Sequence, residues 1–245
     1  MRLTRVHVPQ PLVSGAEITL PEGAAAHLTR VLRLGVGDAC IVFNGDGQDY
    51  AATLVAAGKR DARLRIGEAT RVDRESPLRI TLLQGVAKGE KMDLILQKAT
   101  ELGVHAILPV WSQRSDVKLD GERAAKRLDH WRNVVVSGCE QCGRAVVPEV
   151  APPLSLAAAL AALEPHAMRL LLDPEGTHSL RSMTLDDAAS ICIAVGPEGG
   201  WSPLDREQLH AARFDGLRLG PRILRTETAG LSAISALQAR FGDLV

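Results

Sequence analysis

The stretch SICIAVGPEGGWSPLDREQLHAARFDGLRLG, residues 190–220, contains a strand, a glycine-rich loop, a helix and a second strand. An apolar run is followed by GPEGG, and an amphipathic segment begins near Ser202–Pro203. Short apolar strands separated by amphipathic helices are typical of a parallel sheet that helices cover on both faces. In such sheets ligands bind at the carboxyl ends of the strands, so the glycine-rich loop is a candidate site.

The same alternation extends over residues 73–245. Further apolar strands are predicted at LRITLLQGV, AILPVW and MRLLLD, and helices at EKMDLILQKATELG, at residues 121–142 and at ETAGLSAISALQARF. We therefore predict an α/β domain with a parallel sheet for this region.

Residues 1–72 follow another pattern, in which short strands alternate with turns. One helix is predicted around residues 22–34, and strands are predicted at 38–43, 49–56 and 62–69, separated by NGDGQ and by Gly58–Lys59. This spacing is that of β-hairpins, so we predict a small antiparallel barrel. The polar segment RVDRESP, residues 71–77, then serves as a linker.

Charge and cysteine content narrow the class of protein. The 29 Lys and Arg balance the 29 Asp and Glu, so attraction to a polyanion must come from local clusters. Arg60, Arg63 and Arg65 form one cluster, which is either a solvated face or a nucleic-acid contact. Four cysteines are too few for a disulfide framework, and MRLTRVHVPQPLVSG lacks the apolar core of a signal peptide. We expect a cytosolic protein without a membrane segment.

The loop AVGPEGGWS, residues 194–202, has glycines that let backbone N–H groups approach a ligand. It is neither GxGxxG nor GxxxxGK[ST], and Glu198 would repel phosphate. The Glu198 carboxylate suits ribose hydroxyls or a cation instead. Taken alone, the motif is equally consistent with a turn before a helix.

A second loop, LRLGPRILRTETA, begins where Gly220–Pro221 stops a strand. Thr226 is predicted to cap the following helix, with Glu227 or Thr228 in the first turn. Capping leaves Arg222 and Arg225 unexplained, and arginines beside a glycine-rich loop suit anion or base contacts.

A third loop, WSQRSDVK at residues 111–118, also follows a predicted strand and exposes Arg114. Arg114, Glu198 and Arg225 thus lie on loops at the ends of three strands, which predicts an active site. The pair CEQC, residues 139–142, has no second pair or histidine cluster at ligand spacing, so we predict no metal site. Arg144, just beyond it, is read as part of an exposed helix end or an interface.

Five motifs together resemble, in order and spacing, the RsmE family of SPOUT-class RNA methyltransferases: QKATELGV (97–104), QRSDVK (113–118), EQCGR (140–144), VGPEGGWS (195–202) and LGPRILRTETA (219–229). The resemblance runs from about residue 78 to residue 245. The N-terminal barrel is similar to the family's PUA-like RNA-binding domain in position and strand pattern.

The resemblance implies methylation of N3 of a uridine in 16S ribosomal RNA near the decoding centre, with S-adenosyl-L-methionine as cofactor and the assembled 30S subunit as substrate. It implies two domains, a PUA-like β-barrel at 1–72 and a SPOUT domain at 73–245. The SPOUT domain has a C-terminal trefoil knot, a rare exception to the rule against threaded loops. A homodimer is also implied, with Trp131, Ser137, Arg144 and the final helix as candidate contacts.

Carried over residue by residue, the resemblance implies that backbone groups of two knot loops hold the adenine and ribose of the cofactor, with Leu172 as a third wall. The loop residues are Gly196, Glu198 and Gly200 in one loop and Leu219, Leu224, Arg225 and Thr228 in the other. Arg114 and Arg225 would stabilise charge on the uracil oxygens, and Glu227 is a proton acceptor or a helix-start residue. Two other hypotheses remain open: a non-catalytic RNA-binding or assembly protein, and a nucleotide-dependent enzyme, against which Glu198 and the missing lysine argue.

Overall fold

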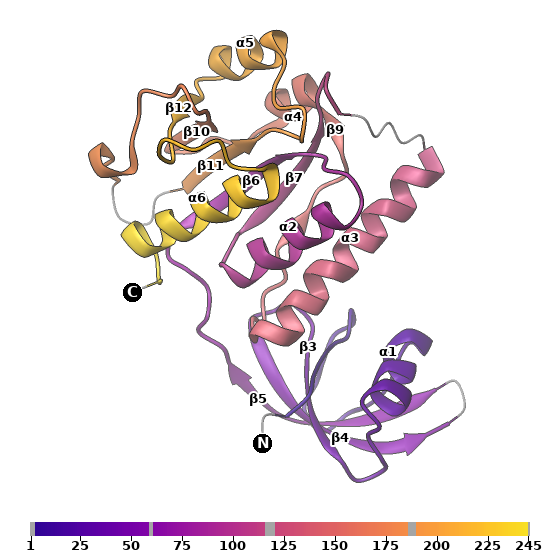
Figure 1. The fold of residues 1–245 in the computed structure, drawn as a ribbon. Helices are drawn as coiled ribbons and strands as arrows, with labels where there is room; N and C mark the ends of the chain where they lie inside the picture. Colours follow the sequence, from indigo (N-terminus) through magenta and orange to yellow (C-terminus); the bar gives the residue numbers. More distant parts are fainter. Residues whose placement is uncertain (1–2, 59–60, 116–120, 186–189, 245) are drawn as a thin grey trace. The chain divides into compact units, whose positions relative to one another are not determined.

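The computed structural model describes residues 3–58, 61–115, 121–185 and 190–244 (Figure 1). Arg60 and the end of the motif QRSDVK lie outside the described residues. The chain forms two compact units. One holds the chain up to Glu75 together with Val136–Val147, and the other holds Ser76–Val135 and Pro148–Val245.

The described part of the first unit contains a mostly antiparallel sheet in the order β1-β3-β4-β5-β2. Its strands are β1 (Arg5–His7), β2 (Glu17–Thr19), β3 (Ala39–Phe43), β4 (Gln48–Ala57) and β5 (Ala62–Arg71). Helix α1 (Glu22–Ala26) continues as a π-helical turn (His27–Val31), and Leu28 of this turn is fully buried. Apolar residues alternate along β4 and β5 and bury Leu54 and Leu64, because successive side chains of a strand point to opposite faces. The three predicted hairpin strands are therefore present.

The end of helix α3 (Gly121–Cys142) and the residues after it complete this unit. Arg5 forms an ion pair with Asp49 and donates a hydrogen bond to the Arg144 carbonyl oxygen at 2.9 Å. The Arg144 guanidinium in turn binds the Glu75 carboxylate, Nε to Oε1 2.9 Å. Arg144 is only 4% exposed. The prediction that it lies on an exposed helix end or interface is therefore wrong.

Several side chains of α3 itself are buried. Trp131 is fully buried within the chain itself, so its indole is not free to contact a second copy, whereas Ser137 is exposed. Cys139 is also fully buried, and burial raises the pKa of its thiol to about 12. Among the described residues no group of three or more His, Cys, Asp or Glu side chains is placed to hold a metal ion.

The second unit is built on a parallel sheet in the order β12-β10-β11-β6-β7-β8, with β9 also pairing with β7. The bounds are β6 (Arg79–Gly85), β7 (Ala106–Trp111), β8 (Glu149–Val150), β9 (Leu154–Ser155), β10 (Met168–Leu172), β11 (Ser190–Val195) and β12 (Asp215–Leu217). The predicted α/β fold with a parallel sheet is confirmed.

Helices cover both faces of this sheet. Helices α2 (Glu90–Glu101) and α6 (Thr226–Phe241) pack against each other, and α6 crosses in front of the sheet in Figure 1. Helices α4 (Leu156–Ala162) and α5 (Pro203–Ala211) pack against each other, and their side chains share a core with Leu83 of β6. Leu82, the neighbour of Leu83, instead faces Gly230 of α6. This alternation puts Gln84 on the α6 side.

Helix α5 begins as predicted at Ser202–Pro203. The Ser202 side chain accepts from the Asp205 N–H at 3.0 Å, and the Asp205 carboxylate accepts from the Ser202 N–H at 2.9 Å. This reciprocal pair is a capping box, which satisfies N–H groups that a helix start leaves free. In the described part of the chain, no helix is both long and apolar enough to cross a membrane.

Two local predictions are wrong. Strand β12 ends at Leu217, so the loop before α6 is longer than the sequence suggests. β12 pairs with β10 and, through an isolated bridge at Leu217, with His178. Thr226 is not the N-cap of α6, because Arg225 occupies the cap position and Thr226 is the first helical residue. The Thr226 hydroxyl makes hydrogen bonds outside its own helix.

Candidate active site

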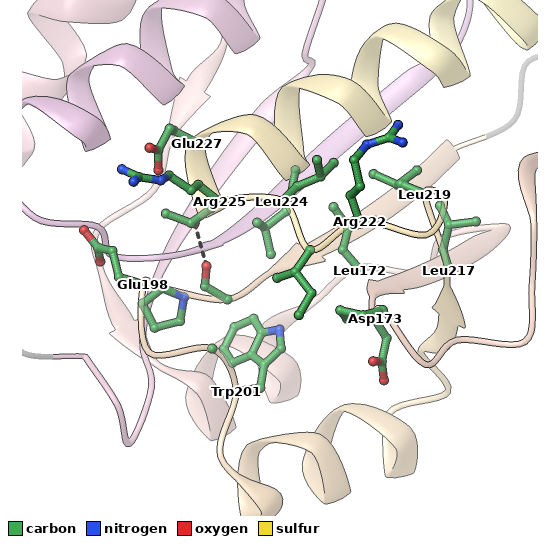
Figure 2. A pocket seen from close by; sticks show the side chains of 18 of the residues that line it. Leu172, Asp173, Glu198, Trp201, Leu217, Leu219, Arg222, Leu224, Arg225 and Glu227 are labelled. Atoms are coloured by element: carbon green, nitrogen blue, oxygen red, sulfur yellow. Dashed lines mark hydrogen bonds between the residues drawn. The ribbon is translucent and has the colours of Figure 1, made fainter.

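A pocket of about 450 Å³ lies at the carboxyl ends of β10, β11 and β12, which are neighbours in the sheet (Figure 2). Loops leaving adjacent parallel strands diverge there and leave a crevice. In Figure 2 Glu198 lies toward one end of the pocket and Asp173 toward the other. The lining includes Lys91, Leu172, Asp173, Glu198, Trp201, Arg206, Leu217, Leu219, Arg222, Leu224, Arg225, Thr226 and Glu227.

The loop after β11 folds tightly on itself. A Cβ atom on Gly196 would lie 3.2 Å from the Gly200 Cα, and Gly200 has a φ of +67°, so both positions favour glycine. The Glu198 carboxylate accepts from the Lys88 N–H at 3.1 Å and from the Lys91 ammonium at 3.2 Å. Burial alone would raise the pKa of Glu198, but these hydrogen bonds outweigh burial and lower it. Glu198 is therefore an ionised acceptor at the pocket.

The loop after β10 brings an ion pair that sequence reasoning missed. Asp173, whose side chain is 10% exposed, pairs with Arg206 of α5, and both line the pocket. The Asp173 carboxylate also accepts from the Glu175 N–H at 3.0 Å. Asp173 directly follows the three leucines of the predicted strand MRLLL, and a carboxylate at the end of such a strand is the signal that could have identified it.

The loop after β12 supplies Leu219, Leu224 and Arg225 to the lining. It turns at Gly220, whose φ of +118° is rarely adopted by other residues. Arg222 and Arg225 are both exposed and both line the pocket, as expected of arginines placed to meet a ligand.

The start of α6 brings two more polar groups to the pocket. Thr226 donates to the Gly196 carbonyl oxygen at 2.6 Å. Glu227 lines the pocket, and its Oε2 atom is buried without a hydrogen-bond partner in the described part of the chain. A buried carboxylate oxygen with no partner is costly, which suits a group that meets a polar ligand.

Two predicted site residues lie outside the pocket lining. Thr228 is exposed on α6, and its N–H bonds the Arg225 carbonyl oxygen at 2.9 Å. Arg114 is exposed and donates from Nη1 to the Gly199 carbonyl oxygen at 3.0 Å, so it contacts the glycine loop. The pocket does bring together the other predicted residues, which are Leu172, Gly196, Glu198, Gly200, Leu219, Leu224, Arg225 and Glu227.

The pocket combines apolar walls with a few polar groups, as small-molecule sites do. Leu172, Leu219 and Leu224 are apolar, and Trp201, only 4% exposed, presents an indole whose Nε1 is buried without a partner in the described residues. The carboxylates of Glu198 and Glu227 can accept hydrogen bonds from ligand hydroxyls, and the arginines of the lining can donate to ligand oxygens.

Comparison with known proteins gives concordant results for both parts of the chain. Residues 74–238 match a family model described as an RNA methyltransferase domain, and residues 20–67 match an RNA methyltransferase PUA domain. Ribosomal RNA small subunit methyltransferase E of Buchnera aphidicola subsp. Schizaphis graminum is 31% identical, over 99% of this chain and 98% of that protein.

The enzyme of the same name from Bacillus subtilis is 34% identical, over 86% of this chain and 85% of that protein. Among solved structures, ribosomal RNA small subunit methyltransferase E from Neisseria gonorrhoeae, bound to S-adenosyl methionine, is 40% identical. It superposes with a TM-score of 0.94 and covers 100% of both chains.

Proposed function

Because this chain belongs to the ribosomal RNA small subunit methyltransferase E (RsmE) family of RNA methyltransferases, we propose that it methylates N3 of one uridine in 16S ribosomal RNA. The target lies near the decoding centre of the assembled 30S subunit, and S-adenosylmethionine is the methyl donor. The observation that carries this proposal is the pocket, where the loops after three neighbouring strands and the start of α6 bring Glu198, Arg225 and Glu227 beside apolar walls.

The residues present suit S-adenosylmethionine. Leu172, Leu219 and Leu224 offer apolar surface to the adenine, and the ionised Glu198 is an acceptor for ribose hydroxyls. Tight turns at Gly196 and Gly200 allow the backbone close to the ligand. When bound, the cofactor supplies a methyl group on a positively charged sulfur, which leaves as S-adenosylhomocysteine after transfer.

The protein's own side chains would prepare the uridine. N3 carries a proton at neutral pH, and the partnerless Oε2 of Glu227 is the proposed acceptor of that proton. Arg225, at the pocket, would stabilise the negative charge that develops on the uracil oxygens. Arg114 donates a hydrogen bond from Nη1 to the Gly199 carbonyl oxygen, and its other guanidinium N–H groups would be donors to the base. Alignment of N3 with the methyl group supplies much of the rate.

The target base must be unpaired, because uridine N3 is hidden in a base pair. We propose that the N-terminal domain, residues 1–72, binds the RNA, and that residues 73–245 form the catalytic SPOUT domain. In it, the loops at 196–200 and 219–225 belong to a trefoil knot. The proposal includes a homodimer and a cytoplasmic location, where ribosomal subunits are assembled.

The test is methyl transfer from labelled S-adenosylmethionine to small subunits that lack this modification, followed by nucleoside analysis of the RNA. The expected product is 3-methyluridine. Label in another nucleoside would overturn the target and retain the methyltransferase. Free RNA and 70S ribosomes are tested as further substrates. If none of the substrates is labelled although the protein binds S-adenosylhomocysteine tightly, a non-catalytic RNA-binding protein is favoured.

A further inference from the structure

A buried relay of hydrogen bonds joins strand β6, the glycine loop and helix α6. Gln84 donates from Nε2 to the Thr226 hydroxyl at 3.0 Å and to the Gly85 carbonyl oxygen at 2.9 Å. Thr226 donates onward to the Gly196 carbonyl oxygen at 2.6 Å. We propose that Gln84 and the Thr226 hydroxyl are positioning residues that hold the two pocket loops in the geometry that binds the cofactor.

The direction of the relay follows from the donors available. A threonine hydroxyl has a single proton and two acceptor lone pairs. Because the Gln84 amide donates to Thr226, the hydroxyl proton is left to point at Gly196. The amide thus sets the orientation of the hydroxyl, and the hydroxyl fixes the carbonyl group with which the glycine loop begins. Valine at position 226 has nearly the same shape but neither accepts nor donates.

Because the relay is buried, the loss of one of its hydrogen bonds is costly in free energy. Gln84 is fully buried and Thr226 is 8% exposed, so water does not readily replace a lost partner. A buried polar group left without its partner costs the full desolvation of that group. The Gln84 Oε1 atom has no partner among the described residues, so the relay depends on the amide N–H groups.

Backbone packing leaves the relay little freedom to relax. A Cβ atom on Gly85 would lie 2.5 Å from the Pro197 Cδ, so strand β6 and the glycine loop are in direct contact. On the opposite side, a Cβ atom on Gly230 of α6 would lie 3.4 Å from the Val195 Cγ2 and 3.7 Å from the Gln84 Oε1. Strand, loop and helix therefore meet around Gln84, and a change there reaches both walls of the pocket.

This inference rests on the proposed cofactor pocket, and the experiment separates the two. S-adenosylhomocysteine is titrated calorimetrically into the full-length wild type, Thr226→Val, Thr226→Ser, Gln84→Met and the control Thr100→Val. Thr100 is a buried threonine of the same unit whose hydroxyl bonds the Leu96 carbonyl oxygen, at 2.8 Å, in α2. KM for S-adenosylmethionine and kcat are then measured for each variant.

Thr226→Val and Gln84→Met should raise the Kd and the KM about tenfold, the effect of one or two buried hydrogen bonds, with kcat changed less than twofold. Thr226→Ser should restore wild-type binding, and Thr100→Val should lower only the melting temperature. If Thr226→Val does not fold, the Kd and KM of Gln84→Met are compared with those of the wild type and Thr100→Val instead.

Wild-type affinity in Thr226→Val and Gln84→Met would overturn the relay and leave the proposed function standing. An equal loss of affinity in Thr100→Val would also overturn it, because the effect would then be one of general stability. Failure of the wild type itself to bind S-adenosylhomocysteine would overturn the proposed pocket and this inference together.

Discussion

Arg225 is exposed and lines the pocket at the point where the last loop enters α6. Arg225→Ala should lower kcat by about 100-fold, because it removes a charged donor from the developing negative charge. The melting temperature should hardly change, since the side chain is exposed. Arg123→Ala, an exposed arginine on α3, is the matched control. Turnover near the wild-type rate in Arg225→Ala would rule out the proposed role.

His166 makes stability depend on pH. Its Nε2 lies 2.9 Å from the Thr81 hydroxyl and its Nδ1 lies 2.7 Å from the Glu164 carbonyl oxygen. Burial lowers the pKa of His166 despite the bond to Glu164. The unfolded chain therefore binds this proton more readily, so the stability that neutral His166 contributes is present above about pH 6.5 and lost as the pH falls through its lowered pKa.

Thermal unfolding between pH 7.5 and pH 5.5 tests this prediction. The melting temperature of the wild type should fall more steeply with decreasing pH than that of His166→Gln. The pKa of His7 is also lowered, chiefly by burial, and its contribution is common to both proteins. Parallel curves for the two proteins would contradict the assignment to His166.

Among single residues, those whose type alone predicts a role in the site are charged side chains on or beside glycine-rich loops. Arg225 is predicted because an arginine beside a glycine-rich loop is poor core material, and Glu198 because its carboxylate suits ribose hydroxyls or a cation; both line the pocket. Thr226 was misread because capping rules consider only the helix itself, whereas its hydroxyl finds a partner 30 positions away, at Gly196. Asp173 and Arg206 were missed because an ion pair between two elements leaves no local pattern.

The contact between strand β6 and the glycine loop depends on Gly85. Gly85→Ala would place a methyl group 2.5 Å from the Pro197 Cδ, so strand or loop must shift. We expect a loss of about 1–3 kcal/mol of stability, as for other overpacking substitutions, and weaker binding of S-adenosylhomocysteine. Denaturant unfolding and calorimetry measure these two effects.

Gly23→Ala is the control for that substitution, because nothing lies within 4 Å of a Cβ atom at this position of α1. Alanine should stabilise the helix there by up to about 1 kcal/mol. Equal effects of the two substitutions would show that Gly85 has no special contact with the loop.

Helices and strands were predicted correctly where apolar residues recur along the sequence at a helical spacing or in an unbroken run. The long helix α3 runs over the predicted 121–142, and the strands β10 and β11 fall on apolar runs. Strand β12 is shorter than DGLRLG because its pairing with β10 stops at Leu217, whereas the apolar spacing of Leu217 and Leu219 continues into the loop. The spacing of apolar residues indicates which side chains are buried, but it does not indicate where a strand stops pairing with its neighbour.

The first unit depends on one buried arginine from late in the chain. Arg144→Ala should cost about 1.5–3 kcal/mol in the free energy of unfolding, because it removes a buried guanidinium and its charged hydrogen bonds to Glu75, which is 33% exposed. Arg63→Ala, which removes an exposed ion pair with Glu17, should cost less than about 1 kcal/mol. Urea unfolding of the full chain measures both, and similar costs would show that burial does not set the value of the Arg144 pair.

At the scale of the whole molecule, the sequence predicted two patterns in succession, hairpins and then alternating strands and helices. It did not predict that residues 136–147 belong with the N-terminal strands. The hydrogen bonds that join the two segments connect residues such as Arg5 and Arg144, which are separated by 139 positions. The sequence alone does not distinguish a buried arginine from one at the surface.

The long separation of Gln84 and Thr226, 142 positions, bears on how the chain is made. Ribosomes add roughly 5–20 residues per second and domains fold from the N-terminus as they emerge, so β6 waits roughly 7–30 s for its partner. The glycine loop is itself made late in that interval, and it waits roughly 1.5–6 s for Thr226, which lies 30 positions after Gly196. A copy released early by interrupted translation would therefore lack a complete pocket, because residues up to Ala229 line it.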